Sequence, residues 1–248
     1  MSDPIIIVDK VSKSYGGVKA NVDISMIVKR GSITGIIGPN GCGKTTLFNS
    51  IVGYHPIDGG SIQFDDQEIS KLRVGDIARL GMLRTFQQTR IYSKMDCVDN
   101  MQISVSHRQD SKSSIFASRR GEIRDRAEHL LEFVGLYSKR SLISGDLSFG
   151  QQKLLEFAMA LMNEPKVLLL DEPTAGINPT LINGLIDRLR RANEELGITL
   201  CVIEHNMRVI MNLASHIYCL SNGKMLADGK PETLQNDTRV IDAYLGGH

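Results

Sequence analysis

The sequence has 248 residues, with 29 Lys and Arg against 28 Asp and Glu, so its formal net charge is +1. This balance argues against a dedicated nucleic-acid binder, which usually carries a basic excess or a basic stripe. Hydrophobic residues make up 42% and charged residues 23%, which is ordinary globular usage and argues against long disorder. The apolar runs are much shorter than the ~20 residues of a membrane span, and the first ten residues do not resemble a secretory signal. We therefore expect a cytoplasmic chain.

The first ninety residues predict strands at 5–9, 22–28 and 61–64, separated by Gly-rich turns. A further strand at 32–37 runs into a glycine-rich loop, and a helix follows at about 44–52. From about 98 to 162 the pattern is helical with few strand signals, which predicts an inserted helical subdomain at about 91–162. Residues 107–126 within it are polar and rich in arginine, and we interpret them as a solvated surface, with a lipid or partner contact as the alternative.

The last third alternates strand and helix. Strands are predicted at 167–170, 198–203 and 217–220, and helices at about 179–196 and 206–214. An Asn222-Gly223 turn predicts a hairpin back into a strand at 225–228. Continuous apolar strands alternating with amphipathic helices indicate a mostly parallel sheet covered on both faces. The expected core is therefore an α/β fold built from about 1–90 and 163–248.

The glycine-rich loop carries the clearest chemistry. Residues 38–45 read Gly-Pro-Asn-Gly-Cys-Gly-Lys-Thr and fit the pattern GxxxxGK[ST]. Glycines let backbone N–H groups turn inward around a triphosphate, and the following helix adds its partly positive N-terminus. Lys44 is expected to reach the β- and γ-phosphates, and the Thr45 hydroxyl to bind Mg²⁺. The alternative is a flexible turn, but the strand before and the helix after favour nucleoside triphosphate binding. The expected phosphate contacts are Gly38, Pro39, Asn40, Gly41, Cys42, Gly43, Lys44, Thr45 and Thr46.

The cysteines show no metal-ligand spacing. Cys42, Cys97, Cys201 and Cys219 are scattered, which is typical of reduced thiols. Cys42 lies near a helix N-terminus, a setting that can lower a thiol pKa. We therefore expect that alkylating Cys42 blocks nucleotide hydrolysis and that nucleotide protects it. An unreactive filler at this loop position is the alternative.

An apolar strand ends in two carboxylates, Asp171 and Glu172. Ligands of open α/β sheets bind at the carboxyl ends of strands, so this pair is expected to face the phosphate loop. Asp171 is placed to bind the Mg²⁺ of the nucleotide, and Glu172 to orient or deprotonate an attacking water. Alone, such a pair is more often an ordinary solvated strand end. The phosphate loop in the same chain favours the functional interpretation.

Together these motifs resemble the ATP-binding-cassette ATPases. Residues 147–152, Leu-Ser-Phe-Gly-Gln-Gln, resemble the LSGGQ signature, and 176–179 resemble the D-loop. The order of motifs along the whole chain matches the family. The resemblance implies a P-loop NTPase core with an N-terminal antiparallel β subdomain and an inserted α-helical subdomain. The activity that it implies is ATP hydrolysis with Mg²⁺.

The resemblance also assigns roles to residues that carry no signal alone. It implies that Tyr15 stacks on adenine, that Gln87 joins the core to the helical subdomain and contacts the metal, and that His205 contacts the γ-phosphate. The implied catalytic residues are Glu172, His205, Lys44 and Gln87, and the implied metal ligands are Thr45, Gln87 and Asp171. In isolation Tyr15 reads as a packed turn residue, and His205 as a satisfied strand-end histidine.

The signature implies a dimer. Ser148 and Gly150 start a helix, where a hydroxyl and backbone N–H groups can face outward as an anion site. In the family, the signature of one subunit closes over the nucleotide of another, so Ser148, Gly150 and Gln151 are implied ATP contacts in trans. Phe149 replaces the usual glycine, and Asn178 stands where the D-loop often has aspartate.

Several stretches resemble the ATPase subunits of importers for branched-chain amino acids, urea or short amides. They are residues 84–87, 147–153, 175–179, 203–207 and 243–246. The implied partners are transmembrane permease subunits and a second ATPase subunit, either an identical copy or a paralogue, on the cytoplasmic face of the membrane. Two other functions stay open: a soluble assembly ATPase, for example in iron–sulfur cluster building, and a DNA-maintenance ATPase. The last fits poorly because the chain has no heptad arms.

Overall fold

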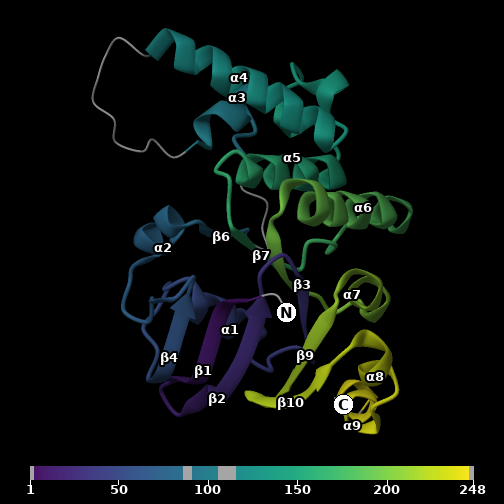
Figure 1. Ribbon diagram of the computed structural model, residues 1–248. Helices are drawn as coiled ribbons and strands as arrows, with labels where there is room; N and C mark the ends of the chain where they lie inside the picture. Colours follow the sequence, from purple (N-terminus) through teal and green to yellow (C-terminus); the bar gives the residue numbers. More distant parts are fainter. Residues whose placement is uncertain (1–2, 86–90, 106–115, 246–248) are drawn as a thin grey trace. The chain divides into compact units, whose positions relative to one another are not determined.

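Apolar segments far apart in the sequence pair into one six-stranded sheet, seen in a computed structural model that describes residues 3–85, 91–105 and 116–245 (Figure 1). The order is β10-β9-β3-β8-β7-β6, with β10 antiparallel at one edge and the rest parallel. Every residue of β3, β7 and β8 is buried, as in parallel strands covered on both faces. The strands are β3 (Ile33–Ile37), β6 (Met82–Arg84), β7 (Val167–Asp171), β8 (Thr199–Ile203), β9 (His216–Ser221) and β10 (Lys224–Gly229).

The predicted hairpin between β9 and β10 is confirmed. Asn222 and Gly223 have φ angles of 49° and 73°, so both central residues of the turn are left-handed. That is the requirement of a type I′ turn, whose twist matches the flanking strands. The Asn222-Gly223 turn therefore lets β10 fold back and pair antiparallel with β9 at the edge of the sheet.

A separate four-stranded antiparallel sheet has the order β2-β1-β4-β5. In β2, buried and exposed residues alternate, which is typical of a sheet with one covered face. The three strands predicted here, at 5–9, 22–28 and 61–64, are all longer than predicted, and β1 and β2 run up to the Gly16-Gly17 turn. The strands are β1 (Pro4–Tyr15), β2 (Val18–Lys29), β4 (Gly59–Phe64) and β5 (Gln67–Glu68).

Helix α1 (Lys44–Ile51) joins the two sheets through the core. Its side chains Leu47, Phe48 and Ile51 are fully buried in one apolar cluster with residues of both sheets, among them Ile24 and Ile36. Burying each such side chain contributes about 1.5–3 kcal/mol. The packing therefore fixes the helix whose first residue is the lysine of the phosphate loop.

Other helices accompany the six-stranded sheet. A Cβ at Gly35 of β3 would lie 2.7 Å from the Ile210 Cγ1 atom, so this glycine lets α7 approach the strand closely. Short helices that the sequence did not predict follow β5 and β10. The helices are α2 (Val74–Leu80), α7 (Met207–Leu213), α8 (Pro231–Gln235) and α9 (Thr238–Leu245).

The middle of the chain is helical, as predicted. Its elements are α3 (Cys97–Ile103), α4 (Phe116–Phe133), the 3₁₀ turns η1 (Tyr137–Lys139) and η2 (Ser144–Asp146), α5 (Phe149–Leu161) and the first part of α6 (Pro179–Leu196). Fully buried Asn100 donates to the Tyr92 and Asp96 carbonyls at 3.1 and 2.9 Å, and to Ser144 Oγ at 3.1 Å. This amide network ties the loop before α3 to the turn before α5.

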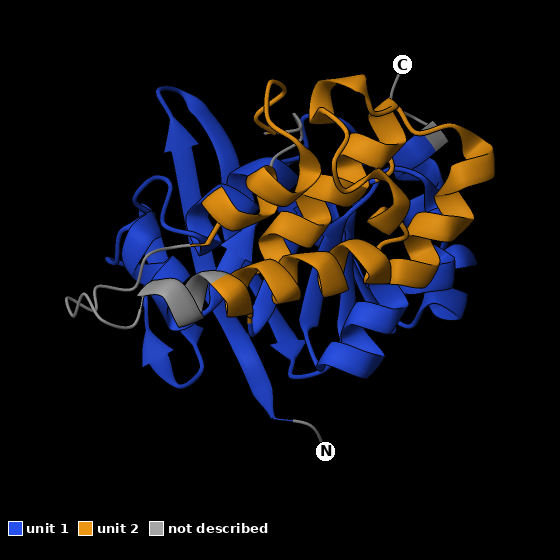
Figure 2. Cartoon of the chain, turned by 90° about the horizontal axis from the view of Figure 1, so that it is seen from above, with its two compact units in different colours: residues 1–84, 166–173, 189–248 blue, residues 85–165, 174–188 orange. Residues whose placement is uncertain are grey.

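Two units divide the chain (Figure 2). Unit 1 holds residues 1–84, 166–173 and 189–248, and unit 2 holds 85–165 and 174–188. Residues 174–188, which the sequence groups with the core, belong to unit 2, so α6 begins in one unit and ends in the other. The α/β fold class, with its antiparallel β part and helical segments, is confirmed.

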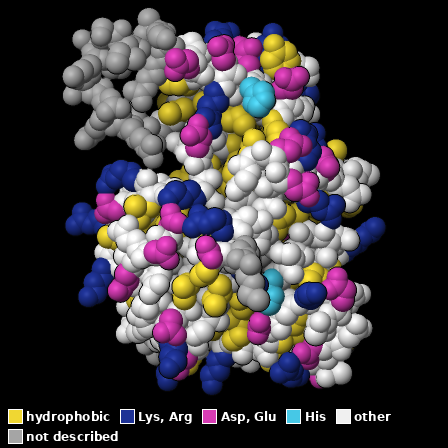
Figure 3. All heavy atoms as spheres, in the orientation of Figure 1, with side chains coloured by type: hydrophobic (Ala, Val, Ile, Leu, Met, Phe, Trp, Pro, Cys, Tyr) yellow, Lys and Arg dark blue, Asp and Glu magenta, His cyan; other side chains and the backbone are white. Residues whose placement is uncertain are grey.

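The distribution of charged side chains and the character of the helices are as the composition predicts. Lys and Arg side chains are interspersed with Asp and Glu over the face drawn in Figure 3, as the near-zero net charge suggests. Within the described residues, no helix combines the length and the apolar character that a membrane crossing requires.

Candidate functional site

The loop between β3 and α1 depends on three left-handed glycines. Gly38, Gly41 and Gly43 have φ angles of 144°, 77° and 103°. These conformations are strained for residues with a Cβ. A Cβ at Gly38 would also lie 2.1 Å from the Leu220 carbonyl oxygen, whereas Gly41 has nothing within 4 Å. The loop is thus packed against β9 at its start and open at its tip.

Lys44 closes the loop from inside. Its side chain is buried, and Nζ donates to the Gly38 and Pro39 carbonyl oxygens at 2.7 and 3.0 Å. Helix α1 begins at Lys44 after Gly43, and no side chain caps its N-terminus. The first N–H groups of a helix lack partners within the helix and carry a partial positive charge. A buried cation and an uncapped helix start therefore face the same loop, which suits a polyanion.

The remaining predicted loop residues differ in exposure. Asn40 and Thr45 are exposed, Pro39 and Thr46 are half-buried, and Cys42 is buried. Thr45, next to Lys44 in the first turn of α1, is exposed and carries a hydroxyl group. Its oxygen is a donor type that Mg²⁺ prefers.

The hypothesis of a low pKa for Cys42 is wrong. The thiol is 3% exposed, and burial raises its pKa above the usual 9.0, although the nearby Lys44 ammonium acts in the opposite direction. The sequence showed the helix N-terminus but not the packing over it, where β9 covers the loop. Burial and the raised pKa favour the alternative of an unreactive filler at this loop position. The other three cysteines are also buried and form no disulfide.

The acidic pair lies at the same sheet edge as the loop. Ile203 of β8 pairs with Ile36 of β3 on one side and with Asp171 of β7 on the other. Because neighbouring strands lie about 4.7–4.9 Å apart, Asp171 is about two strand spacings from the strand that carries the loop. The predicted facing of the two motifs thus has its basis in the register.

Asp171 forms a buried ion pair. Its side chain is 3% exposed, and Oδ2 accepts from Arg84 Nη2 at 2.6 Å. Arg84 also donates to Asn49 Oδ1 of α1. The guanidinium compensates the burial of this carboxylate, which would otherwise be unfavourable.

Glu172 has an unusual backbone. Its φ angle is 50°, in the left-handed region that few non-glycine residues adopt. Its N–H donates to the Ile203 carbonyl at 2.9 Å, which holds the turn against β8. Strain of this kind concentrates at functional sites.

His205 lies beside Glu172. Its Nδ1 is 3.6 Å from Glu172 Oε1, and the two side chains are 52% and 17% exposed. The histidine follows β8, and the glutamate follows the neighbouring β7. Unit 1 therefore gathers the phosphate loop, Asp171, Glu172 and His205 at the carboxyl ends of three adjacent strands.

Tyr15 ends β1 with an exposed ring. It is 48% exposed and makes an edge contact with His55 at 5.6 Å between ring centroids. Lys13 Nζ lies 5.5 Å from the ring centroid. The ring is thus held at its edge and can stack on a planar ligand.

The signature residues belong to unit 2. Ser148 caps α5 in a capping box: Ser148 Oγ accepts from the Gln151 N–H at 3.4 Å, and Gln151 Oε1 accepts from the Ser148 N–H at 3.1 Å. The predicted helix start at Ser148 and Gly150 is present. Part of the predicted anion site, however, is engaged in this internal cap.

Phe149 and Asn178, the two residues that differ from the family pattern, each make a local contact. A Cβ on Gly176 would lie 2.9 Å from Phe149 Cε1, so the aromatic ring covers the glycine of the following loop. Asn178 Oδ1 accepts from the Thr180 N–H at 3.0 Å and from its hydroxyl at 2.9 Å, so the amide caps α6.

The structure does not describe Gln87 or all of the stretch 107–126, and it shows a site residue, Arg84, that the sequence did not predict. Gln87 lies outside the described residues, as does much of the stretch 107–126. The sequence predicted no role for Arg84, which belongs to the stretch 84–87 that resembles importer ATPases. In the structure it forms an ion pair with Asp171, a predicted metal ligand. Its separation of 87 positions from Asp171 leaves no local sequence signal.

The residues present fit a nucleotide with Mg²⁺. Uncapped N–H groups, a buried lysine and the open side of Gly41 can hold phosphates, while the Thr45 hydroxyl and the Asp171 carboxylate offer oxygen ligands. Among the described residues, no group of three or more His, Cys, Asp or Glu side chains forms a metal cluster. A magnesium ion commonly uses one or two carboxylates together with phosphate oxygens, and the site provides for that pattern.

Known proteins resemble the chain throughout its length. The family model described as ABC transporter matches residues 22–175, and the one described as branched-chain amino acid ATP-binding cassette transporter matches 224–248. The high-affinity branched-chain amino acid transport ATP-binding protein BraF of Pseudomonas aeruginosa is 36% identical over 99% of each chain. A crystal structure of an ATP-binding cassette of an ABC transporter in its ADP conformation has a TM-score of 0.88 and 30% identity, covering 99% of this chain and all of that one. A dimeric bacterial ABC transporter cassette has a TM-score of 0.77 and 25% identity, covering 91% of this chain and 98% of that one.

Proposed function

The chain belongs to the ABC transporter family of ATP-binding cassettes, and on that premise we propose that it hydrolyses ATP to power an importer of branched-chain amino acids. One observation carries the ATPase part. The phosphate loop, the Asp171-Glu172 pair and His205 follow three adjacent strands of one sheet. Each group alone has an ordinary structural explanation, but their meeting at one edge does not.

The phosphate loop and Tyr15 would bind the nucleotide. The N–H groups at the start of α1 and the Lys44 ammonium would hold the β- and γ-phosphates, with residues 38–46 surrounding them. On nucleotide binding, Lys44 exchanges its bonds to the Gly38 and Pro39 carbonyls for phosphate oxygens. Tyr15 would stack on adenine. Thr45 and Asp171, with Gln87, would hold Mg²⁺, which supplies charge neutralisation on the phosphates.

Hydrolysis requires a water aligned with the γ-phosphorus. Glu172 would orient that water and accept its proton as the new P–O bond forms and the bond to the β–γ bridging oxygen breaks. His205, 3.6 Å from Glu172 Oε1, would contact the γ-phosphate and fix the carboxylate. The strained backbone of Glu172 supports this assignment, because it places the carboxylate at the sheet edge and beside the histidine.

Composite sites in a dimer complete the proposal. Ser148, Gly150 and Gln151 would close over the nucleotide of a second ATPase subunit, either an identical copy or a paralogue. ATP would favour the closed dimer and hydrolysis the open one, which is a ligand-driven population shift. The dimeric cassette among the similar structures supports this part. Transmembrane permease subunits would hold the pair at the cytoplasmic face of the membrane.

The match over residues 224–248 and the similarity to BraF support the choice of branched-chain amino acids. The test is isolation of the chain from membranes with its associated proteins, followed by reconstitution in proteoliposomes with ATP inside. We expect ATP-dependent leucine uptake that Lys44→Ala abolishes. Isolation with soluble assembly proteins and without a permease would instead favour the cytosolic assembly ATPase.

A further inference from the structure

The far end of the chain contacts the first glycine of the phosphate loop. Tyr244 lies in α9, and its hydroxyl oxygen accepts a hydrogen bond from the Gly38 N–H at 2.7 Å, across 206 positions of sequence. Gly38 itself has little freedom, because the Leu220 carbonyl and the Cys42 sulfur occupy the space beside its Cα atom. The direction of its N–H is therefore fixed, and the tyrosine hydroxyl lies where that N–H points.

The same loop is held at two further points by elements distant in sequence. Asn21 Nδ2 of β2 donates to the Gly43 carbonyl at 3.1 Å, and the Gly223 N–H of the β9–β10 turn donates to the Cys42 carbonyl at 3.1 Å. These two bonds satisfy acceptors near the end of the loop. The Tyr244 bond is the one that satisfies the donor at its start.

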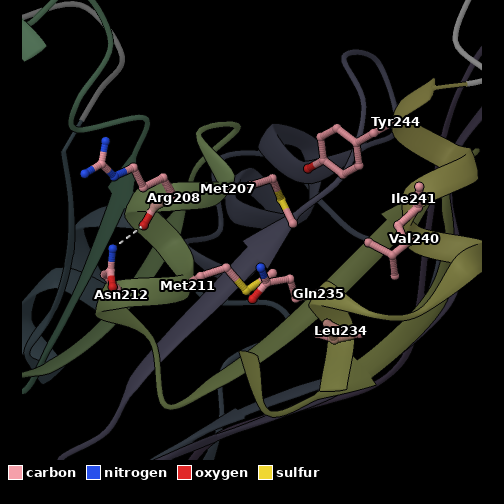
Figure 4. A pocket seen from close by; sticks show the side chains of 9 residues that line it. All are labelled: Met207, Arg208, Met211, Asn212, Leu234, Gln235, Val240, Ile241 and Tyr244. Carbon is pink, nitrogen blue, oxygen red and sulfur yellow. Dashed lines mark hydrogen bonds between the residues drawn. The ribbon is translucent and has the colours of Figure 1, made fainter. Parts of the chain in front are cut away.

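The position of Tyr244 is itself well defined. Figure 4 shows its ring on one side of a cavity of about 570 Å³, with Met207 and Met211 of α7 across from it. Leu234 and Val240 of the α8–α9 segment line the same cavity. Burial raises the pKa of Tyr244 above its ordinary value. Helices α7 and α9 thus position the ring, and the ring positions the loop.

We propose that Tyr244 is a positioning residue for nucleotide binding, which holds the start of the phosphate loop through Gly38. The proposal rests on the proposed nucleotide-binding function of that loop. It gives helix α9, near the end of the described residues, a direct physical link to the nucleotide site. Loss of the hydroxyl leaves a buried N–H without its acceptor, and the loop start then shifts toward water or another acceptor at the expense of its phosphate-binding geometry.

Tyr244→Phe removes the acceptor and keeps the ring, and the chain offers a matched control. Tyr218 of β9 is also largely buried, and its hydroxyl accepts from the Ile27 N–H and donates to the Ile27 carbonyl, both at 3.0 Å. Tyr218→Phe thus deletes a tyrosine–backbone contact of the same kind away from the loop. Tyr218→Phe removes two hydrogen bonds and Tyr244→Phe removes one, so Tyr218→Phe should lose at least as much stability, yet only Tyr244→Phe should weaken nucleotide binding.

The readouts are calorimetric titration of the full chain with ADP and Mg²⁺, steady-state ATPase kinetics, and the NMR signal of the Gly38 amide. For Tyr244→Phe we expect affinity about fivefold to tenfold weaker, as for loss of one buried hydrogen bond. KM should rise with kcat nearly unchanged, and the Gly38 amide proton should move upfield. Tyr218→Phe should keep the affinity and the Gly38 signal of the unmodified chain.

An affinity loss below about threefold, an unmoved Gly38 signal, or an equal loss in Tyr218→Phe would overturn the proposal. Lys44→Ala separates it from the proposed function. If Lys44→Ala weakens ADP binding at least about tenfold and Tyr244→Phe does not weaken it, only the role of Tyr244 fails. If the unmodified chain does not bind ADP, the proposed function fails and the role of Tyr244 fails with it.

Discussion

Two helices of this chain begin at motifs with opposite local chemistry. Helix α1 follows Gly43, which has no side chain to cap it, whereas α5 follows Ser148, which caps it together with Gln151. Both helix starts carry N–H groups that lack partners within the helix. In α1 they remain available to a ligand, while in α5 two of the nearby N–H groups are already satisfied.

The two helix starts are therefore suited to different phosphate-binding tasks. The loop before α1 is supported by its neighbours and open at Gly41, so it can hold a nucleotide by itself. A ligand at the α5 start must compete with the Ser148–Gln151 cap. We therefore expect unit 1 to set nucleotide affinity, and the signature to act only when a second subunit brings a nucleotide to it.

The largest expected effect is on hydrolysis. Glu172→Gln keeps the shape of the side chain but cannot accept a proton, so turnover should fall about 10²–10⁴-fold, the usual contribution of a general base. ATP affinity should change little, because Glu172 does not belong to the phosphate loop. Phosphate release and ATP titration measure the two quantities. Turnover within tenfold of the unmodified chain would remove Glu172 from the catalytic role.

The second-largest effect is expected for Lys44→Ala, which should weaken the affinity for ATP. It deletes a buried cation expected to contact the phosphates, a bond worth about 1.5–3 kcal/mol, so affinity should fall about tenfold to a hundredfold. The variant also loses the two contacts of Nζ with the loop carbonyls. A circular dichroism spectrum checks the fold. An unchanged ATP affinity in a folded variant would contradict the phosphate-loop assignment.

Cys42 should react slowly with alkylating reagents. Its raised pKa means less thiolate at any given pH than in a free thiol, so labelling should be slow at pH 7–8 and accelerate as the pH rises past 9.0. Burial of the sulfur slows the reaction further. Mass spectrometry after iodoacetamide treatment locates and times the modification, with glutathione as reference. Labelling at the rate of glutathione at pH 7 would show that the thiol is neither buried nor protonated.

The smallest effect concerns the α5 cap. Ser148→Ala should lower the free energy of unfolding by about 0.5–2 kcal/mol, the usual value of an N-cap. ATP affinity of the single chain should stay the same, because unit 1 sets it. Ser148→Thr keeps a capping hydroxyl and serves as the control. A thermal unfolding curve that does not separate the two variants would mean that the cap contributes no stability.

Much of the fold follows from local sequence, because strand and helix periodicity and the Asn222-Gly223 turn are local properties. Helix α6 has the predicted bounds, and β7 and β8 differ from theirs by one residue. The short helices α2, α8 and α9 were missed, although Pro231 at the first turn of α8 is a start signal.

The site was predictable in its motifs but not in its long-range contacts. The pairing of Asp171 with Arg84 depends on strands that meet only in the folded sheet. The left-handed turn at Glu172 likewise follows from its bond to β8, which no local pattern reveals. The Cys42 pKa was predicted in the wrong direction because the effect of burial outweighs that of the nearby Lys44 charge.

The most direct test of this division of labour is the dissociation constant of ATP with Mg²⁺, measured for the unmodified single chain, Lys44→Ala and Ser148→Ala. We predict tight binding by the unmodified chain, a loss of at least about tenfold in Lys44→Ala, and an unchanged constant in Ser148→Ala. An equal loss in both variants, or a loss in Ser148→Ala alone, would contradict the claim that the open phosphate loop by itself determines nucleotide affinity.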